Sequence, residues 1–196
     1  MQFLSGILSL ILMSADVILL ERLTGDLSVT ANYGMAQLFA KSVLFLPSTI
    51  GRVYFKDIAA ANSGSKKIVE FLSINIALGL IITAILWTVG PLFIKHVFGS
   101  DYFQATQLLK IMALGTVSSF LWNCISTINV ATGKTAASAL ISSIGAVFGL
   151  TLLLWGIPHY GAVSAAWAMN IAYSAGVFVG LYLIWRSQHQ KCNASL

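Results

Sequence analysis

The chain has 196 residues, of which 58% are apolar and 9% charged, whereas about 25% are charged in an ordinary soluble domain. This composition excludes a soluble globular domain, and a count of two cysteines excludes a disulfide-rich secreted fold. Eleven Lys and Arg residues outnumber six Asp and Glu residues, but the cations lie at the ends of apolar segments, which indicates membrane topology and not nucleic-acid binding.

Six apolar segments are long enough to cross a bilayer, because a hydrocarbon core about 30 Å thick needs about 20 helical residues. In chain order they are residues 2–20, 29–50, 68–93, 107–130, 136–157 and 162–185. They lack the alternation of a membrane β-barrel, and turn-forming residues separate them. The sequence therefore predicts an all-α integral membrane protein, with a bundle of six transmembrane helices in residues 1–185 and a polar cytoplasmic tail in residues 186–196.

The cations also predict an orientation in the membrane. If the six helices alternate in direction, Arg22 and Lys95 lie on one side and seven cations lie on the side of both termini. These seven are Arg52, Lys56, Lys66, Lys67, Lys134, Arg186 and Lys191. Basic residues accumulate in cytoplasmic loops. We therefore expect a multi-pass protein whose two termini are cytoplasmic.

The second segment carries a polar stripe formed by Gln37, Lys41, Ser48 and Arg52, whose spacing keeps them on one face of a helix. Lys41 lies near the middle of the bilayer, where a cation costs about 2.5 to 3.5 kcal/mol unless it faces protein or water. The lysine should therefore point into the bundle. Two interpretations remain: Lys41 pairs with a carboxylate for structure, or it faces a wet cavity that admits substrate.

Asp16 is the only carboxylate within an apolar run and is the candidate partner of Lys41. With a rise of about 1.5 Å per residue, Lys41 lies about 10 Å deeper than Asp16, so a direct pair requires helix tilt or an extended lysine side chain. Pro47 removes one helical hydrogen bond and predicts a kink close to this position.

The fourth segment has a neutral polar face, made by Thr116, Ser119, Asn123 and Ser126. These side chains form hydrogen bonds between helices or line a path for sugar or water, and Asn170 on the last segment has the same two interpretations.

Small residues recur at four-residue spacing in the last two segments. They are Gly145 and Gly149 on the fifth, and Ser164, Ala168, Ala172, Gly176 and Gly180 on the sixth. This spacing predicts close packing between helices, and it gives no reason to assign a substrate role.

Motifs for catalysis are absent from the sequence: no Cys or His pair has zinc spacing, and no glycine-rich phosphate loop follows a strand. We expect no enzyme activity, no cofactor and no bound metal. One enzymatic alternative remains, a polytopic sugar polymerase or ligase that uses His96 and Asp101 of an outer loop as acid and base.

Several loops resemble those of one transporter family. Residues 91–105, PLFIKHVFGSDYFQA, resemble an outer loop with the pattern Pro, apolar run, Phe-Gly, x-Tyr, x-x-Ala. Residues 129–134, NVATGK, resemble a turn with apolar-Ala-x-Gly-Lys, and residues 157–166, IPHYGAVSAA, resemble the entry to the last helix. Asp16, Tyr33 and Ala36 are similar to the start of the second half of these proteins. Two positions depart from the pattern: Asn32 replaces a glycine, and residues 53–56 lack the usual proline.

The family is that of the O-antigen and lipid-linked oligosaccharide flippases, in the multidrug, oligosaccharidyl-lipid and polysaccharide exporter superfamily. The resemblance implies a transporter of the bacterial cytoplasmic (inner) membrane that moves a polyprenyl-diphosphate-linked oligosaccharide outward by alternating access. Members have two related bundles around a central, often cationic cavity, so this chain would supply the second bundle and its partner would be another six-helix bundle. The implied substrate path passes Asp16, Gln37, Lys41, Arg52, Asn123 and Asn170.

Two alternatives keep the same fold. A multidrug exporter of the superfamily should favour carboxylates in its cavity, whereas Lys41 suits a diphosphate as a point charge. A truncated remnant without activity of its own is the other alternative, because the substrate site of such transporters lies between two halves.

Overall fold

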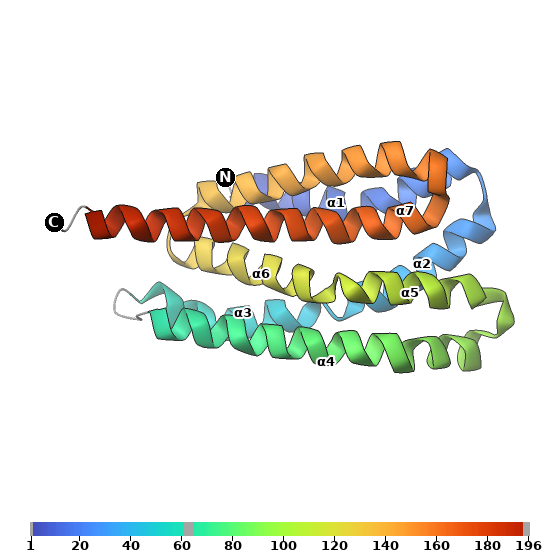
Figure 1. The fold of residues 1–196 in the computed structure, drawn as a ribbon, viewed down its shortest axis with the longest axis horizontal. Helices are drawn as coiled ribbons and strands as arrows, with labels where there is room; N and C mark the ends of the chain where they lie inside the picture. The colour runs from blue at the N-terminus through green and yellow to red at the C-terminus, as the bar shows by residue number, and fades with distance from the viewer. Residues whose placement is uncertain (1, 61–64, 194–196) are drawn as a thin grey trace.

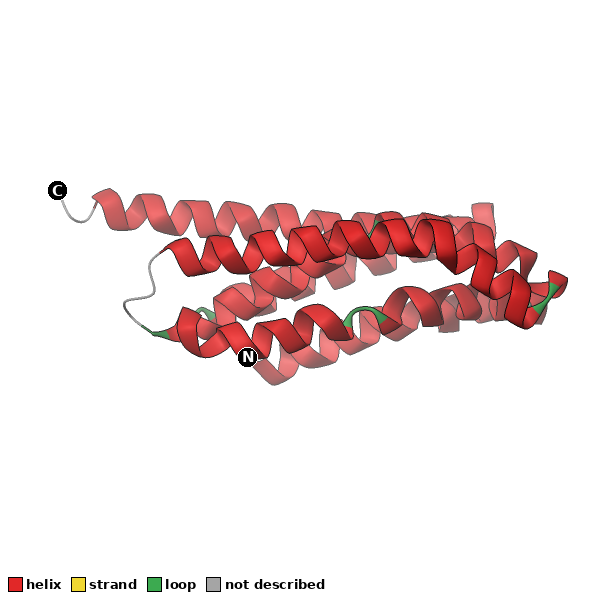
Figure 2. Cartoon of the chain, turned by 90° about the horizontal axis from the view of Figure 1, so that it is seen from below, coloured by secondary structure: helices red, strands yellow, loops and turns green. Residues whose placement is uncertain are grey.

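The computed structural model describes residues 2–60 and 65–193, and in these ranges the chain is helical apart from short connections (Figure 2). The helices are α1 (Gln2–Thr24), α2 (Leu27–Ser42), α3 (Phe45–Ala59), α4 (Ser65–Phe98), α5 (Phe103–Leu114), α6 (Thr116–Ala131) and α7 (Thr135–Asn193), with the short 3₁₀ helix η1 (Ser100–Tyr102) before α5. The prediction of an all-helical protein is confirmed for the described residues.

The chain runs back and forth along one axis, as Figure 1 shows. The α1–α2 and α4–α5 connections lie at the right end of the bundle, while the end of α3 and the start of α4 lie at the left. The α6–α7 turn also lies at the left, and the chain termini lie on that side. This is the alternation that the count of seven cations against two assumes.

α7 consists of two antiparallel limbs, residues 135–160 and 162–193, which meet at Gly161 (Figure 1). Gly161 has φ 58° and ψ −140°, a backbone conformation that residues with a Cβ atom avoid. Pro158 precedes this turn. The limbs correspond to the fifth and sixth predicted segments, and the second limb continues as helix through Asn193.

The second predicted segment is broken into α2 and α3. α2 ends at Ser42 and α3 begins at Phe45, two residues before Pro47. A proline in the first turn of a helix needs no hydrogen-bond partner for its nitrogen, whereas in a continuous helix its ring would clash with the preceding turn. Val43 and Leu44, between the two helices, keep right-handed helical dihedrals, and the Leu44 and Leu46 N–H groups donate to the carbonyls three residues earlier, of Lys41 and Val43 (3.1 Å each). The helix is therefore interrupted for two residues beside Pro47, where the sequence predicts a kink.

The fourth predicted segment is also broken, which the sequence analysis did not predict. α5 and α6 meet at Gly115 with a bend of 44°. Side chains of two other helices bond the carbonyls near the end of α5: Thr83 of α4 donates to the oxygen of Ala113 (3.1 Å), and Asn170 of α7 donates to that of Ile111 (2.7 Å). Irregular backbone at membrane depth needs such partners.

Close packing at the predicted small residues is confirmed around Trp122 of α6. A Cβ atom placed on Gly145 or on Gly176 would overlap the indole ring of Trp122. These glycines belong to the two limbs of α7, so the ring fits against both limbs only because they lack side chains there. Trp122 packs in the same cluster as Ile125, Ile141 and Val177.

Two stretches of helix are apolar and long enough to cross a membrane, Lys66–Phe98 and Thr135–Leu183, and the bent pair α5–α6 makes a third if it counts as one span. The first of these exposes much of its apolar surface, with Leu80, Ile85 and Leu92 at 58%, 49% and 67% exposure. Large exposed apolar surfaces are rare on soluble monomers, and lipid is the solvent that suits them.

Candidate functional site

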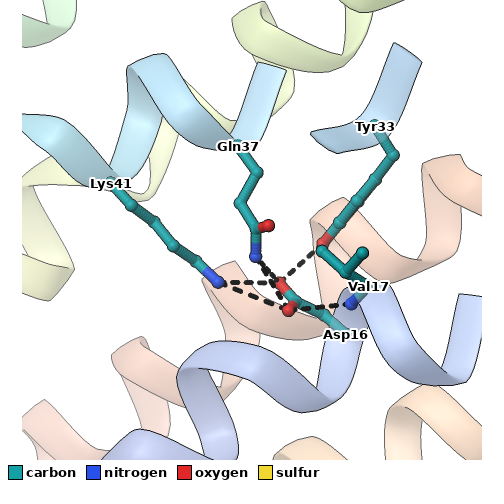
Figure 3. A network of polar contacts seen from close by, with 5 residues as sticks. All are labelled: Asp16, Val17, Tyr33, Gln37 and Lys41. Atoms are coloured by element: carbon teal, nitrogen blue, oxygen red, sulfur yellow. Dashed lines mark hydrogen bonds and ion pairs between the residues drawn. The ribbon is translucent and has the colours of Figure 1, made fainter. Parts of the chain in front are cut away.

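The described interior contains one charged cluster, centred on Asp16 of α1 (Figure 3). Three side chains of α2 donate hydrogen bonds to its carboxylate. The Tyr33 hydroxyl lies 2.9 Å from Oδ2, and Gln37 Nε2 lies 2.8 Å from Oδ1 and 2.7 Å from Oδ2. Lys41 Nζ lies 3.3 Å from Oδ1 and 3.1 Å from Oδ2. The Val17 backbone N–H also donates to Oδ1, at 3.0 Å.

The geometry of α2 explains why these three residues converge. Tyr33, Gln37 and Lys41 are four residues apart, so they form one row on the helix face that is turned toward α1. Helical side chains lean toward the N-terminus of their helix, and for α2 that direction leads back toward Asp16. The extended Lys41 side chain thus closes the predicted depth difference (Figure 3). The direct ion pair between Lys41 and Asp16, which required an extended lysine side chain, is present.

The carboxylate at the centre of the cluster is buried, whereas Gln37 and Lys41 at its edge are partly exposed. Asp16 is 1% exposed, and the Lys41 side chain is 20% exposed. Burying either charge alone would cost several kcal/mol, and the pair is tolerated because opposite charge and neutral donors compensate it. The cluster therefore carries no net charge toward its surroundings.

A second polar region lies between α3 and α6, and it contains Ser48 and Arg52, the other two residues of the predicted polar stripe. Here an open groove of about 440 Å³ is lined by Ser48, Gly51, Arg52, Phe55, Asn123, Ser126, Thr127 and Val130. Arg52 is exposed, and no described carboxylate lies within salt-bridge distance of it. The groove thus presents a guanidinium together with hydroxyl and amide groups.

The candidate path residues therefore separate into two sets. Asp16, Gln37 and Lys41 form the buried cluster, whereas Arg52 and Asn123 line the open groove. These two sets lie on either side of the α2–α3 break.

Asn170, the last candidate path residue, contacts the backbone at the α5–α6 break. Its side-chain nitrogen donates to the Ile111 carbonyl, and its oxygen lies where a Cβ on Gly115 would be. It therefore fixes the α5–α6 break, although it also borders a small cavity beside Asp16.

The polar face of the fourth segment forms one of the predicted hydrogen bonds between helices, and several of its residues line a groove or a cavity. Ser126 bonds Ser138 of α7 at 2.9 Å, and the neighbouring Ser118 accepts from Ser174 of α7 at 3.0 Å, which are bonds between helices. Asn123 lines the groove, and Thr116 and Ser119 line the small cavity.

The residues of the enzymatic alternative lie at the connection between α4 and α5. His96 is in the last turn of α4 and Asp101 in η1, and both are exposed. Among the described residues, no group of three or more His, Cys, Asp and Glu side chains is placed to hold a metal ion.

Sequence reasoning missed two features of the site. Tyr33 enters the sequence prediction only through the resemblance to the start of the second half of the flippases, although its four-residue spacing from Gln37 places it in the same row. The break at Gly115 has no comparable signal, because its partners Thr83 and Asn170 come from distant segments. Comparisons with models of protein families, with curated proteins and with solved structures found no match to this chain.

Proposed function

We propose that this chain is a six-helix transmembrane bundle that forms one half, the carboxy-terminal half, of a flippase for polyprenyl-diphosphate-linked oligosaccharides. The six predicted spans correspond to α1, the broken pair α2–α3, α4, the bent pair α5–α6 and the two limbs of α7. The loop resemblance to O-antigen flippases supports the same assignment. The membrane would be the bacterial cytoplasmic membrane, with the substrate site between this bundle and a second one.

The observation that carries the proposal is the open groove at Arg52. A guanidinium binds phosphate oxygens through two parallel hydrogen bonds, which suits the diphosphate of a lipid-linked sugar. Ser48, Asn123 and Thr127 in the same groove offer hydroxyl and amide groups to sugar hydroxyls. Arg52 lies at the end of the bundle that the charge distribution predicts to be cytoplasmic, where such a substrate would enter.

The structure changes the role that Lys41 has in this proposal. Its charge is compensated by Asp16, so it does not offer a free cation to a substrate at the groove. We assign the first contact with the diphosphate to Arg52 and assign Lys41 to the deeper part of the path.

The multidrug-exporter alternative receives less support. A cationic drug needs an accessible carboxylate, whereas Asp16 is 1% exposed and already bound to Lys41. No described feature of the interior favours this alternative over a phosphate-bearing substrate.

The orientation gives one test. In a variant without Cys124 and Cys192, Ser65→Cys and Ser187→Cys should be protected from a membrane-impermeant thiol reagent added to intact cells, and Ser100→Cys should be labelled. The reason is that the count of seven cations against two predicts residue 100 to be outside. Permeabilised cells provide the control, in which all three should react. Labelling of Ser65→Cys in intact cells without labelling of Ser100→Cys would invert the topology and contradict the proposal.

The activity gives the direct test. With an amino-terminal bundle supplied, Arg52→Ala should reduce complementation of a flippase-deficient strain at least tenfold at normal protein abundance, because it removes the bidentate phosphate contact. Arg52→Lys should retain part of the activity. The matched control is Lys56→Ala, which removes an exposed cation one turn further along α3 that does not line the groove. Equal activity of Arg52→Ala and Lys56→Ala would contradict the proposed substrate contact, and no complementation by the unaltered chain would favour an inactive remnant.

A further inference from the structure

A small, partly open cavity lies beside the charged cluster, between α1, α2, the α5–α6 break and the second limb of α7. Its volume is about 40 Å³, and its polar lining includes Asp16, Lys41, Thr116, Ser119, Asn170 and Tyr173. The hydroxyl of Tyr173 is buried and has no hydrogen-bond partner among the described residues. An edge-to-face contact with Trp122 holds its ring, with the ring centres 5.8 Å apart.

The unpaired hydroxyl requires an explanation, because a buried polar group without a partner costs free energy. Tyr173 is on α7, and on the facing side of the cavity Tyr33 and Gln37 of α2 donate to Asp16. A ligand inside the cavity would give the hydroxyl its partner without moving any helix.

We infer that this cavity is a binding site for water, which connects the Tyr173 hydroxyl to the charged cluster. A water site needs at least about 10 to 15 Å³ and two to four polar partners, so a cavity of about 40 Å³ has room for at least one molecule. The lining supplies hydroxyl, amide and charged groups from four helices, α1, α2, α6 and α7.

The charges of the lining select water over an ion. A cation would approach the ammonium group of Lys41, and an anion would approach the carboxylate of Asp16, and these two groups lie 3.1 Å apart. Next to such a neutral pair, a molecule that both donates and accepts hydrogen bonds is favoured over a monovalent ion. The apolar alternative, a dry cavity, would leave the Tyr173 hydroxyl unpaired.

Internal water changes how the ion pair can behave. A charged group that leaves its partner must be solvated at once, and water in contact with the pair lowers that cost. Asp16 and Lys41 thus form an ion pair that is also in contact with water. Lys41 therefore combines the two interpretations from the sequence, a structural pair with a carboxylate and a position facing a wet cavity. This inference does not depend on the proposed flippase function.

X-ray radiolytic footprinting tests the inference on the full chain in lipid nanodiscs, because short pulses convert bound water into hydroxyl radicals that oxidise adjacent side chains. Met112 and Met169 line the cavity and are 9% and 5% exposed. We expect both to be oxidised at least fivefold faster than Cys124, which is 0% exposed and does not line the cavity, although its thiol is intrinsically reactive. Rates for Met112 and Met169 no higher than that of Cys124 would show a dry cavity and overturn the inference.

Tyr173→Phe supplies the second measurement, because it removes only the hydroxyl. We expect oxidation of Met169 to fall at least twofold while the size-exclusion profile is unchanged. An unchanged oxidation rate together with a higher melting temperature would mean that the hydroxyl was simply unpaired, which contradicts water binding. Replacing sodium and potassium by choline should leave the oxidation rate unchanged, and an increase would show that a monovalent cation occupies the cavity instead.

Discussion

Lys41→Ala is expected to reduce the amount of folded protein several-fold. The substitution leaves the Asp16 carboxylate, which is 1% exposed, without its cation. Removing one partner of a buried ion pair costs about 3 to 5 kcal/mol, because the remaining charge is uncompensated. Membrane-fraction abundance and the melting temperature in detergent measure the effect. The control is Lys110→Ala, which removes an exposed cation on α5 and should change neither value appreciably.

A double-mutant cycle separates the pair from the individual side chains. Asp16→Ala should be less harmful than Lys41→Ala, because the lysine is 20% exposed and its long side chain can turn toward water. The double variant Asp16→Ala with Lys41→Ala should recover abundance relative to Lys41→Ala alone, with a coupling of about 1 to 3 kcal/mol. Additive losses would show that the two residues do not stabilise the bundle as a pair.

The same variants decide whether Lys41 also acts on substrate. If the double variant folds at normal abundance but fails to complement a flippase-deficient strain, Lys41 or Asp16 has a role in transport beyond stability. Lys41→Arg should then retain part of the activity, because the positive charge is kept. Full complementation by Lys41→Ala at normal abundance would contradict both the structural and the transport role.

The charged cluster could be predicted from the sequence to a large extent. The four-residue spacing of Gln37 and Lys41 defines a helix face, and the cost of a mid-membrane cation directs that face into the bundle. When depth is counted only as a rise of about 1.5 Å per residue along each helix, Asp16 lies too far from Lys41 for a direct pair. The long Lys41 side chain, which leans toward the N-terminus of α2, covers the remaining distance to Asp16. The spacing of residues along the sequence does not include the length and direction of a side chain.

The groove and the second helix break could not be predicted in the same way. Pro47 predicts the α2–α3 break, because a proline cannot continue the hydrogen bonding of a helix. Gly115 gives no such indication, because glycine is common in continuous membrane helices. The bend depends on hydrogen bonds from Thr83 and Asn170, which only the tertiary arrangement brings together. The groove likewise depends on α3 and α6 lying side by side, and the sequence does not specify which helices are neighbours.

The two breaks also have a common position in the bundle. Leu44 at the α2–α3 break and Gly115 at the α5–α6 break line the same small cavity as Asp16. Discontinuous helices around a polar interior are typical of transporters, since irregular backbone at membrane depth occurs where it is buried in protein or borders water. The charged cluster, the internal cavity and the breaks therefore form one connected region, with the Arg52 groove beyond it.

The packing of Trp122 leads to the last large effect. Gly176→Val and Gly145→Val should each lower the melting temperature strongly and reduce abundance, because the new side chain would occupy the volume of the Trp122 indole ring. Overpacking of this kind costs about 1 to 3 kcal/mol, and it is felt more strongly where two helix limbs contact the same ring. The matched control is Gly34→Val on α2, since no atom lies within 4 Å of a Cβ placed there.

Compensation at the ring tests whether the clash is the cause. Trp122→Leu creates space beside both glycines, so Gly176→Val combined with Trp122→Leu should melt at a higher temperature than Gly176→Val alone, even though Trp122→Leu by itself destabilises its cluster with Ile125, Ile141 and Val177. If Gly176→Val and Gly34→Val melt at the same temperature, the limbs of α7 do not pack against Trp122 as described. The expected result instead assigns Gly145 and Gly176 to the packing of the two limbs of α7 against Trp122 of α6.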